Sequence, residues 1–454
     1  MKNFAARLAA IVIITALTLA GVVPSFASGG NTESEPDITG TSAILIDGGT
    51  GEILYEKNAH EKRDPASITK ILNCLVVLEN MDLDQEVTVP YQIDQIGHVM
   101  GLKEGEVLTV RQLLYAMMTY SCNDAAEMLA VATGGSIDEF CKMMNERAVK
   151  CGAKDTNFTN PNGLNGWGQE NHRTTAYDIA MIAREAMKNS MFRKLVSTRS
   201  YTIPATNKSE ERKLVNTNPC IYPEGKTVDV NGKQVSFSYK GMTGIKTGST
   251  GTAGECFCGS AKRGGTELIG VSLNSKDEFV RFTDVTTLLD YGFSKYFTYK
   301  ALDSDEPSGS VKVSQGEKRS VDIGLKDDFD ITLKKGYDTD GISVSIEKDS
   351  RKIKAPVSKG TKLGKAVATD KDGKVLASAD LYALESSGKG GPLSHIGIAD
   401  EDLIYFFTVI TLILIAVVAV ILINRRKRAA RARARARQRE RQRREAEEKL
   451  RKLM

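Results

Sequence analysis

Two residues near the start of the chain have the types and spacing of a nucleophile and its base. Ser67 and Lys70 stand three positions apart in the segment that follows Pro65. On a helix, positions i and i+3 share a face, so the serine hydroxyl and the lysine amine can meet. A serine hydroxyl needs a neighbouring base to become a good nucleophile, and lysine serves when burial or a nearby cation keeps it neutral. The pair predicts covalent catalysis, although a single such motif also fits a solvated helix face.

Two later motifs supply the other groups that such a serine would need. In Ser121-Cys122-Asn123, the hydroxyl can relay a proton, and the amide can hold both the lysine amine and a substrate carbonyl. Lys246-Thr247-Gly248-Ser249 adds a second cation, which raises the cost of charging Lys70 and attracts an anionic substrate. Its threonine can donate to a carboxylate, and its glycine lets a substrate backbone approach. Each motif alone is weak, whereas the three in this order form a strong signal.

Histidines and cysteines do not offer a competing site. The four histidines form no His-Glu-x-x-His motif, which excludes a zinc protease of that type, and none belongs to a nucleophile elbow. The seven cysteines show no metal-binding spacing. Cys256 and Cys258 would lie on one face of a strand, a poor geometry for a disulfide. We therefore expect free thiols, no metal and no cofactor.

The elements that must position the three motifs follow from local patterning. Periodicity predicts a helix over 67–78 and further helical stretches over 110–132, 137–149, 175–187 and 283–291. A hairpin joins 41–46 to 52–55, residues around 200–275 alternate as strands, and 268–273 is a buried strand. We therefore expect an α/β (α+β) domain over 38–300, with an antiparallel sheet flanked by helices. The second motif should lie in a break between helical stretches.

A smaller domain should follow a polar break at 303–309. Short alternating runs such as Val311-Lys-Val313 and Ile331-Thr-Leu333 are typical of an all-β domain, which we place over 308–385. The residues after it are rich in Gly and Ser, and we expect a flexible linker over 386–402.

Both ends of the chain carry membrane signals. Two basic residues, an apolar run and small residues ending at Ala27 predict a signal peptide over 1–27. The 20 residues 404–423 carry no charge and would span about 30 Å as a helix, which predicts one transmembrane helix over 403–424. Because 400–402 are acidic and 425–428 basic, the tail 425–454 should be cytoplasmic and the catalytic domain extracellular.

The net charge of +5 is divided unevenly along the chain. Residues 424–454 hold 15 Lys and Arg against four Asp and Glu, the first 27 residues add +2, and 28–423 therefore carry −8. The tail has no aromatic side chain to stack on a base. We interpret it as a basic helix beside anionic lipid and expect no nucleic-acid partner.

Beyond the three motifs, residues 38–384 resemble the D-alanyl-D-alanine carboxypeptidases, which are low-molecular-weight penicillin-binding proteins. The resemblance extends to 64–71, to Asn160-Pro-Asn-Gly-Leu164, to 172–178 and to Arg281 ahead of 288–293. It implies a fold like that of serine β-lactamases and transpeptidases, release of the terminal D-alanine from the peptidoglycan stem pentapeptide, and inhibition by β-lactam antibiotics. Cys122 departs from the small residue of the family pattern, and we interpret it as a buried, inert thiol.

The resemblance also implies a role for each candidate residue. The nucleophile, the general base and the proton relay would be Ser67, Lys70 and Ser121. The substrate-binding residues would be Asn123, Lys246, Thr247, Ser249 and Arg281. Among these, Thr247 and Arg281 are candidates for the terminal carboxylate, and the backbone N–H groups of Ser67 and Ser249 for the oxyanion hole. For His172, a structural role and a place near the cleft are equally compatible with the pattern.

Three alternatives stay open at this point. A class A β-lactamase needs a deacylating glutamate after the second motif, and residues 155–169 contain none. A peptidoglycan transpeptidase is compatible with the motifs, although the single-span layout disfavours it. A non-catalytic wall-binding scaffold would have no need of an intact set of motifs.

Overall fold

The computed structural model describes residues 35–94, 96–164, 171–225, 228–230, 233–349 and 352–453. The signal peptide predicted at 1–27 lies outside the described residues. Both domains and the C-terminal helix belong to the second of two compact units, Met1–Asp37 and Ile38–Met454.

The first domain is built on a five-stranded antiparallel sheet with the order β2–β1–β11–β10–β9. The strands are β1 Ser42–Asp47, β2 Ile53–Lys57, β9 Met242–Thr250, β10 Gly254–Arg263 and β11 Thr266–Ser275. The predicted hairpin and the buried strand at 268–273 are confirmed. The edge strand β9 carries the third motif, so one side of that motif is open to a ligand.

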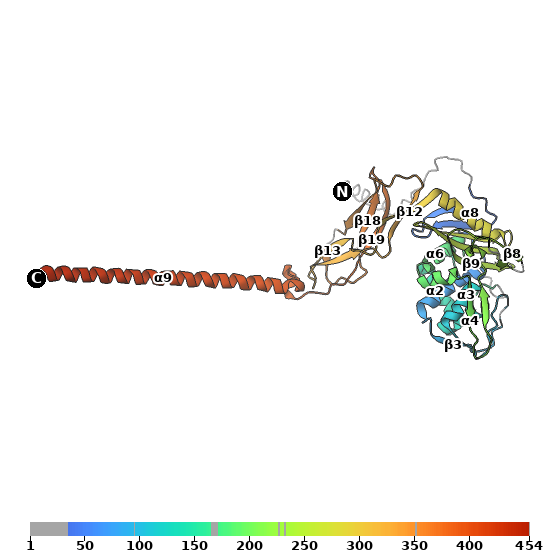
Figure 1. Ribbon diagram of the computed structural model, residues 1–454, viewed down its shortest axis with the longest axis horizontal. Coiled ribbons are helices and arrows are strands. Elements are labelled where there is room, and N and C mark those ends of the chain that lie inside the picture. The colour runs from blue at the N-terminus through green and yellow to red at the C-terminus, as the bar shows by residue number, and fades with distance from the viewer. Residues whose placement is uncertain are drawn as a thin grey trace, which may run out of the picture. The chain divides into compact units, whose positions relative to one another are not determined.

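Helices cover both faces of this sheet (Figure 1). On one face, α8 packs on β10 and β11 through Phe282 and Leu288. The other face bears the main apolar core and a larger helical layer. The helices are α2 Lys70–Asn80, α3 Val110–Thr119, α4 Asn123–Gly134, α5 Ile137–Lys150, α6 Ala176–Ala186, α7 Ser190–Ser197 and α8 Val280–Lys295.

The helical stretch predicted at 110–132 is divided where the second motif lies. The helix α3 begins at a capping box formed by Thr109 and Gln112 and ends at Thr119, and α4 begins at Asn123. Between them Ser121 has a φ of +68°, a left-handed conformation that cannot continue a helix. The expected break is confirmed, and it places the motif at the start of α4.

Three two-stranded antiparallel sheets accompany this core. They pair β3 Glu86–Thr88 with β4 Val107–Thr109, β5 Ser200–Ile203 with β6 Arg212–Val215, and β7 Val228–Val230 with β8 Lys233–Val235.

The all-β domain begins one strand earlier than the boundary predicted at 308. Strand β12 follows α8 and pairs with β15, because its aromatic residues belong to the second apolar cluster. A six-stranded sheet with the order β16–β18–β19–β14–β13–β17 completes the domain. The strands are β12 Tyr296–Leu302, β13 Gly309–Ser314, β14 Ser320–Gly324, β15 Phe329–Lys334, β16 Ser343–Lys348, β17 Ile353–Lys354, β18 Lys362–Thr369 and β19 Val375–Ala383.

Residues 386–402 differ from the flexible linker that their composition predicted. Ser387 and Lys389 form bridges with Val357 and Gly316 of the all-β domain, and Asp402 pairs with Arg319. These contacts, together with the 3-10 helices Pro392–Ile396 and Asp400–Asp402, hold the segment in place. Such backbone pairing depends on neighbours that are distant in sequence, so the composition of the segment does not reveal it.

The helix α9, Leu403–Leu453, runs without a break through the predicted transmembrane span and the basic tail. By length and composition, it is long and apolar enough to cross a membrane.

Candidate active site

Ser67 lies in a tight 3-10 turn, Ala66–Thr69, that runs directly into α2. Ala66 has a φ of +48°, a conformation that costs a non-glycine residue on the order of 1 kcal/mol or more. Gly163 packs against the turn, and a Cβ at this position would lie 1.8 Å from the Ala66 carbonyl oxygen. The turn that presents Ser67 is thus held by a glycine that no larger residue can replace without displacing it.

Lys70 connects the segments that form the site. Its fully buried amine lies 2.8 Å from Ser67 Oγ, 3.4 Å from Ser121 Oγ and 2.7 Å from Asn123 Oδ1. It also donates to the Asn162 carbonyl at 3.0 Å. Burial, and then the charge of Lys246, lowers the pKa of Lys70 well below its ordinary value. The arrangement favours a neutral amine beside the serine hydroxyl, which is the state that a base requires.

The third motif places a second buried lysine and a hydroxyl beside Ser67. Burial, and then the charge of Arg281, lowers the pKa of Lys246 to about 7, and Lys246 Nζ donates to the Thr247 carbonyl at 3.1 Å. Thr247 Oγ1 lies 2.6 Å from Thr217 Oγ1. At Gly248 a Cβ would lie 3.1 Å from the backbone nitrogen of Ser67. Glycine therefore lets β9 pass close to Ser67.

Glu255 on β10 binds two of the predicted substrate-binding residues, and the sequence analysis missed it. Ser249 Oγ donates to Glu255 Oε1 at 2.5 Å. The buried Arg281 forms an ion pair with the other carboxylate oxygen of the partly buried Glu255 and donates to the Gly248 carbonyl at 3.2 Å. Arg281 is thus already paired, which makes it a weaker candidate for a substrate carboxylate than Thr247. No spacing in the sequence relates Glu255 to either partner.

Six of the eight predicted site residues line one cleft of about 460 Å³. Lys70 and Lys246 do not line it because both are buried. Further lining residues come from loops and from the end of β6, and of these only Leu164 belongs to a stretch that the sequence analysis singled out. They include Gly97, His98, Tyr120, Leu164, Asn216 and Thr217.

His172 lies outside the cleft lining and supports the turn that carries Ser67. Its Nδ1 accepts from the Thr159 backbone N–H at 3.0 Å, and its Nε2 lies 2.9 Å from Thr69 Oγ1. The Thr69 hydroxyl in turn donates to the Ala66 carbonyl at 2.9 Å. Because Nδ1 accepts, the ring proton belongs on Nε2, and burial lowers the pKa of His172 to about 4. Of the two readings that the sequence left open, the geometry supports the structural one.

Cysteine chemistry does not enter this arrangement. Cys122 is buried, and burial raises the pKa of its thiol above the ordinary value, as expected for an inert cysteine. All seven cysteines lie in the described part of the chain as free thiols. Among the described residues, no cluster of His, Cys, Asp or Glu is placed to hold a metal ion.

Comparisons with known proteins extend over both domains. A family model described as D-alanyl-D-alanine carboxypeptidase matches residues 30–277, and one described as penicillin-binding protein 5, C-terminal domain, matches 296–389. The D-alanyl-D-alanine carboxypeptidase DacF of Bacillus subtilis is 34% identical over 393 residues, which cover 85% of this chain and 95% of the relative.

Solved structures show the same likeness. Penicillin-binding protein 5 from Haemophilus influenzae matches 78% of this chain and 99% of its own, with 28% identity and a TM-score of 0.61. A mutant of the Streptomyces K15 DD-transpeptidase matches 57% of this chain and 99% of its own, with 32% identity and a TM-score of 0.51.

Proposed function

The chain belongs to the D-alanyl-D-alanine carboxypeptidase family of penicillin-binding serine hydrolases, and we propose that it works through an acyl-enzyme on Ser67. The reaction is release of the terminal D-alanine from peptidoglycan stem pentapeptides. The observation that carries the assignment is the distance of 2.8 Å between the buried Lys70 amine and the Ser67 hydroxyl. Ser67 lines the cleft, where a substrate can reach it.

Acylation uses Lys70 as the general base. The neutral amine takes the hydroxyl proton as Ser67 Oγ attacks the carbonyl carbon of the last peptide bond. Asn123 Oδ1 and the Asn162 carbonyl orient the amine. The backbone N–H groups of Ser67 and Ser249 stabilise the oxyanion. The close approach of β9 to Ser67 at Gly248 supports this assignment, because it brings the two backbone segments together.

Ser121 completes the proton path to the leaving group. Its hydroxyl lies 3.4 Å from Lys70 Nζ and lines the cleft, so it can pass the proton from the lysine to the departing D-alanine amine. Water then attacks the acyl carbon with Lys70 again as the base. The products are the shortened stem peptide and free D-alanine, and Ser67 regains its proton.

Substrate binding depends on the third motif. Thr247 and its neighbour Thr217 present hydroxyls to the terminal carboxylate, while Lys246 and Arg281 provide the positive field. Asn123 also holds the substrate backbone.

The membrane arrangement belongs to the same proposal. The apolar part of α9, residues 403–424, crosses the membrane once, with an acidic flank outside and the basic tail inside. The catalytic domain and the all-β domain then face the wall, where the stem peptide is found.

The test uses the full chain in detergent with a pentapeptide that ends in D-Ala-D-Ala. We expect release of one D-alanine per peptide and a lasting adduct with a labelled penicillin. Rapid turnover of penicillin would favour a β-lactamase. Transfer of the acyl group to an added amine would favour a transpeptidase, a candidate that the K15 relative raises. If the protein released no D-alanine and formed no penicillin adduct, the proposal would be contradicted.

A further inference from the structure

The loop 96–106 beside the cleft fixes the orientation of the Asn123 amide. Asn123 Nδ2 donates to the Ile96 carbonyl at 2.6 Å, and the Asn123 backbone N–H donates to the His98 carbonyl at 2.7 Å. Because the loop binds Nδ2, the side-chain oxygen Oδ1 faces Lys70 at 2.7 Å. A reversed amide would turn its N–H₂ donors toward the lysine amine.

The loop has an inner anchor at the start of α4. The buried carboxylate of Asp124 accepts the backbone N–H groups of Met100, Gly101 and Leu102 at distances of 2.9 to 3.2 Å. This residue directly follows Asn123, so the anchor and the amide that it supports lie on the same helical turn.

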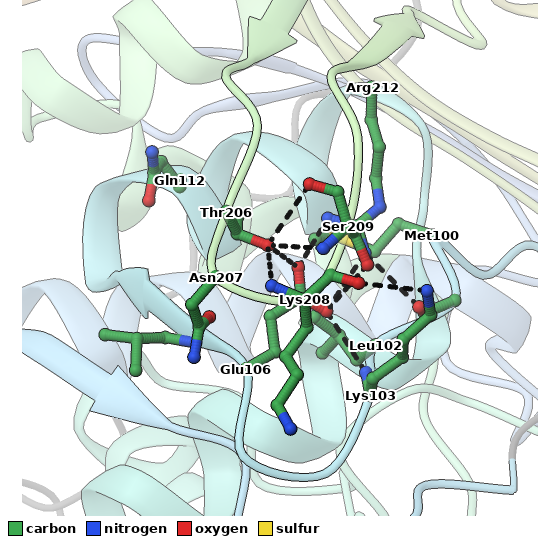
Figure 2. A network of polar contacts seen from close by, with 12 residues as sticks. Met100, Leu102, Lys103, Glu106, Gln112, Thr206, Asn207, Lys208, Ser209 and Arg212 are labelled. Atoms are coloured by element: carbon green, nitrogen blue, oxygen red, sulfur yellow. Dashed lines mark hydrogen bonds and ion pairs between the residues drawn. The ribbon is translucent and has the colours of Figure 1, made fainter.

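The outer anchor is Glu106, whose carboxylate is fully buried. Arg212 on β6 donates to its two oxygens at 2.7 and 3.0 Å, and Thr206 Oγ1 donates at 2.7 Å. Figure 2 shows the side chains of Thr206, Ser209 and Arg212, all from the β5–β6 hairpin, converging on Glu106. Burial alone would raise the pKa of Glu106, but hydrogen bonds from Arg212 and Thr206 hold it below the ordinary value. The carboxylate is therefore charged.

This ion pair joins two segments that border the cleft, the loop 96–106 and the strand β6. Gly97 and His98 of the loop line the cleft. Val215 and Asn216, which follow Arg212 closely in the chain, line it as well. A buried ion pair is a poor source of stability because desolvation offsets its attraction. Its position instead points to a geometric role, since Arg212 also donates to the Gly101 carbonyl at 3.3 Å within the inner anchor.

We propose that Glu106 and Arg212 are positioning residues for acyl transfer, which act through the loop 96–106 by holding the Asn123 amide toward Lys70. The inference rests on the proposed function, because it assigns Asn123 a part in the acylation of Ser67. Glu106 itself does not line the cleft.

The test is a double-mutant cycle on the rate of Ser67 acylation by a fluorescent penicillin, with the full chain in detergent. Glu106→Gln should lower the second-order rate about tenfold in the wild-type background, but less than about twofold in an Asn123→Ala background. Thr206→Val keeps the Glu106–Arg212 ion pair and removes only the Thr206 hydroxyl, which donates to Glu106 and accepts from the backbone N–H groups of Lys208 and Ser209. It should give a smaller decrease with the same dependence on Asn123. It keeps the test valid where Glu106→Gln folds poorly.

The ion pair of Arg193 with Glu267 provides a matched control. It is bidentate, with two contacts of 2.7 Å, and lies in the same domain. Glu267→Gln should lower the melting temperature as Glu106→Gln does, yet leave acylation within about twofold of wild type. Equal losses for Glu106→Gln with and without the Asn123 amide, or the same loss in Glu267→Gln, would overturn the proposal. A wild-type protein that is not acylated would instead contradict the proposed function.

Discussion

Two buried lysines set the chemistry at the scale of single residues. Lys70 is the proposed base, and the charge of Lys246 is the second cause, after burial, of its lowered pKa. Lys246 itself has a pKa lowered to about 7 by burial and then by the charge of Arg281. The site thereby keeps an amine neutral that would be charged in water.

Removal of the second charge should therefore move the pH dependence of the reaction. In Lys246→Gln, the pKa of Lys70 rises because one cause of its lowering is gone. The acid limb of the acylation rate against pH then shifts to higher pH, in addition to any loss of substrate affinity. Lys262→Gln, an exposed lysine on β10, serves as the control and should leave the limb in place. A limb that stays or moves to lower pH in Lys246→Gln would contradict the assigned base.

His172 should contribute a pH-dependent part of the stability. Its pKa of about 4 in the folded chain lies below the ordinary 6.5, so the unfolded chain binds a proton first as the pH falls. Wild type should lose up to about 3 kcal/mol of unfolding free energy through this group between pH 6.5 and pH 4. His172→Phe should cost about 2 kcal/mol at pH 7, because the Thr159 N–H loses its acceptor.

Urea unfolding of both proteins at pH 7 and pH 4.5 tests this expectation. The difference in unfolding free energy between wild type and His172→Phe should be smaller at pH 4.5 than at pH 7. Only wild type carries the imidazole, so only wild type loses stability through its protonation. A difference that is the same at both values would show that the ring is not held neutral.

The residue types identified the candidate groups but not their supports. Ser67 and Lys70 meet as their i, i+3 spacing predicted. The Asn162 carbonyl was not predicted because every residue has a backbone carbonyl, so residue type does not mark it. Glu255 was not predicted because its position opposite Ser249 depends on the strand register. The loop 96–106 escaped for the same reason, since its hydrogen bonds come mainly from the backbone.

At the scale of elements, the geometry depends on how turns meet helices. The break between α3 and α4 was predictable, because residues around Ser121 interrupt two amphipathic stretches. The strained Ala66 and its contact with Gly163 were not, since both depend on packing between segments nearly 100 residues apart. The flexible linker at 386–402 was mispredicted because pairing with the all-β domain overrides its Gly-rich composition.

Gly163→Ala tests the support of the nucleophile turn. The added Cβ would collide with the Ala66 carbonyl oxygen and displace Ser67, and a shift of about 1 Å lowers a rate about a hundredfold. Gly152→Ala is the matched control, because its φ of +88° is similar but nothing lies within 4 Å. It should cost about 1 kcal/mol of stability and leave penicillin acylation near wild type. Normal acylation in Gly163→Ala would show that the turn tolerates the displacement.

At the scale of the whole molecule, charge is sorted along the chain. The +11 tail and the −8 portion lie on either side of the apolar part of α9. That segment is followed by Arg425, Arg426 and Lys427, which favour a cytoplasmic tail.

Protease added to intact cells should therefore digest the catalytic domain and spare an epitope tag at the C-terminus. Digestion of the tag in intact cells, with protection of the catalytic domain, would reverse the proposed topology. Permeabilised cells provide the control, in which both parts should be cut.

The identity of the nucleophile is the central claim, and peptide mapping of the penicillin adduct tests it most directly. After brief incubation with a penicillin and proteolysis, mass spectrometry should place the adduct on the peptide that contains Ser67, and Ser67→Ala should abolish it while the protein stays folded. An adduct on Ser121, or one that persists in Ser67→Ala, would contradict the account.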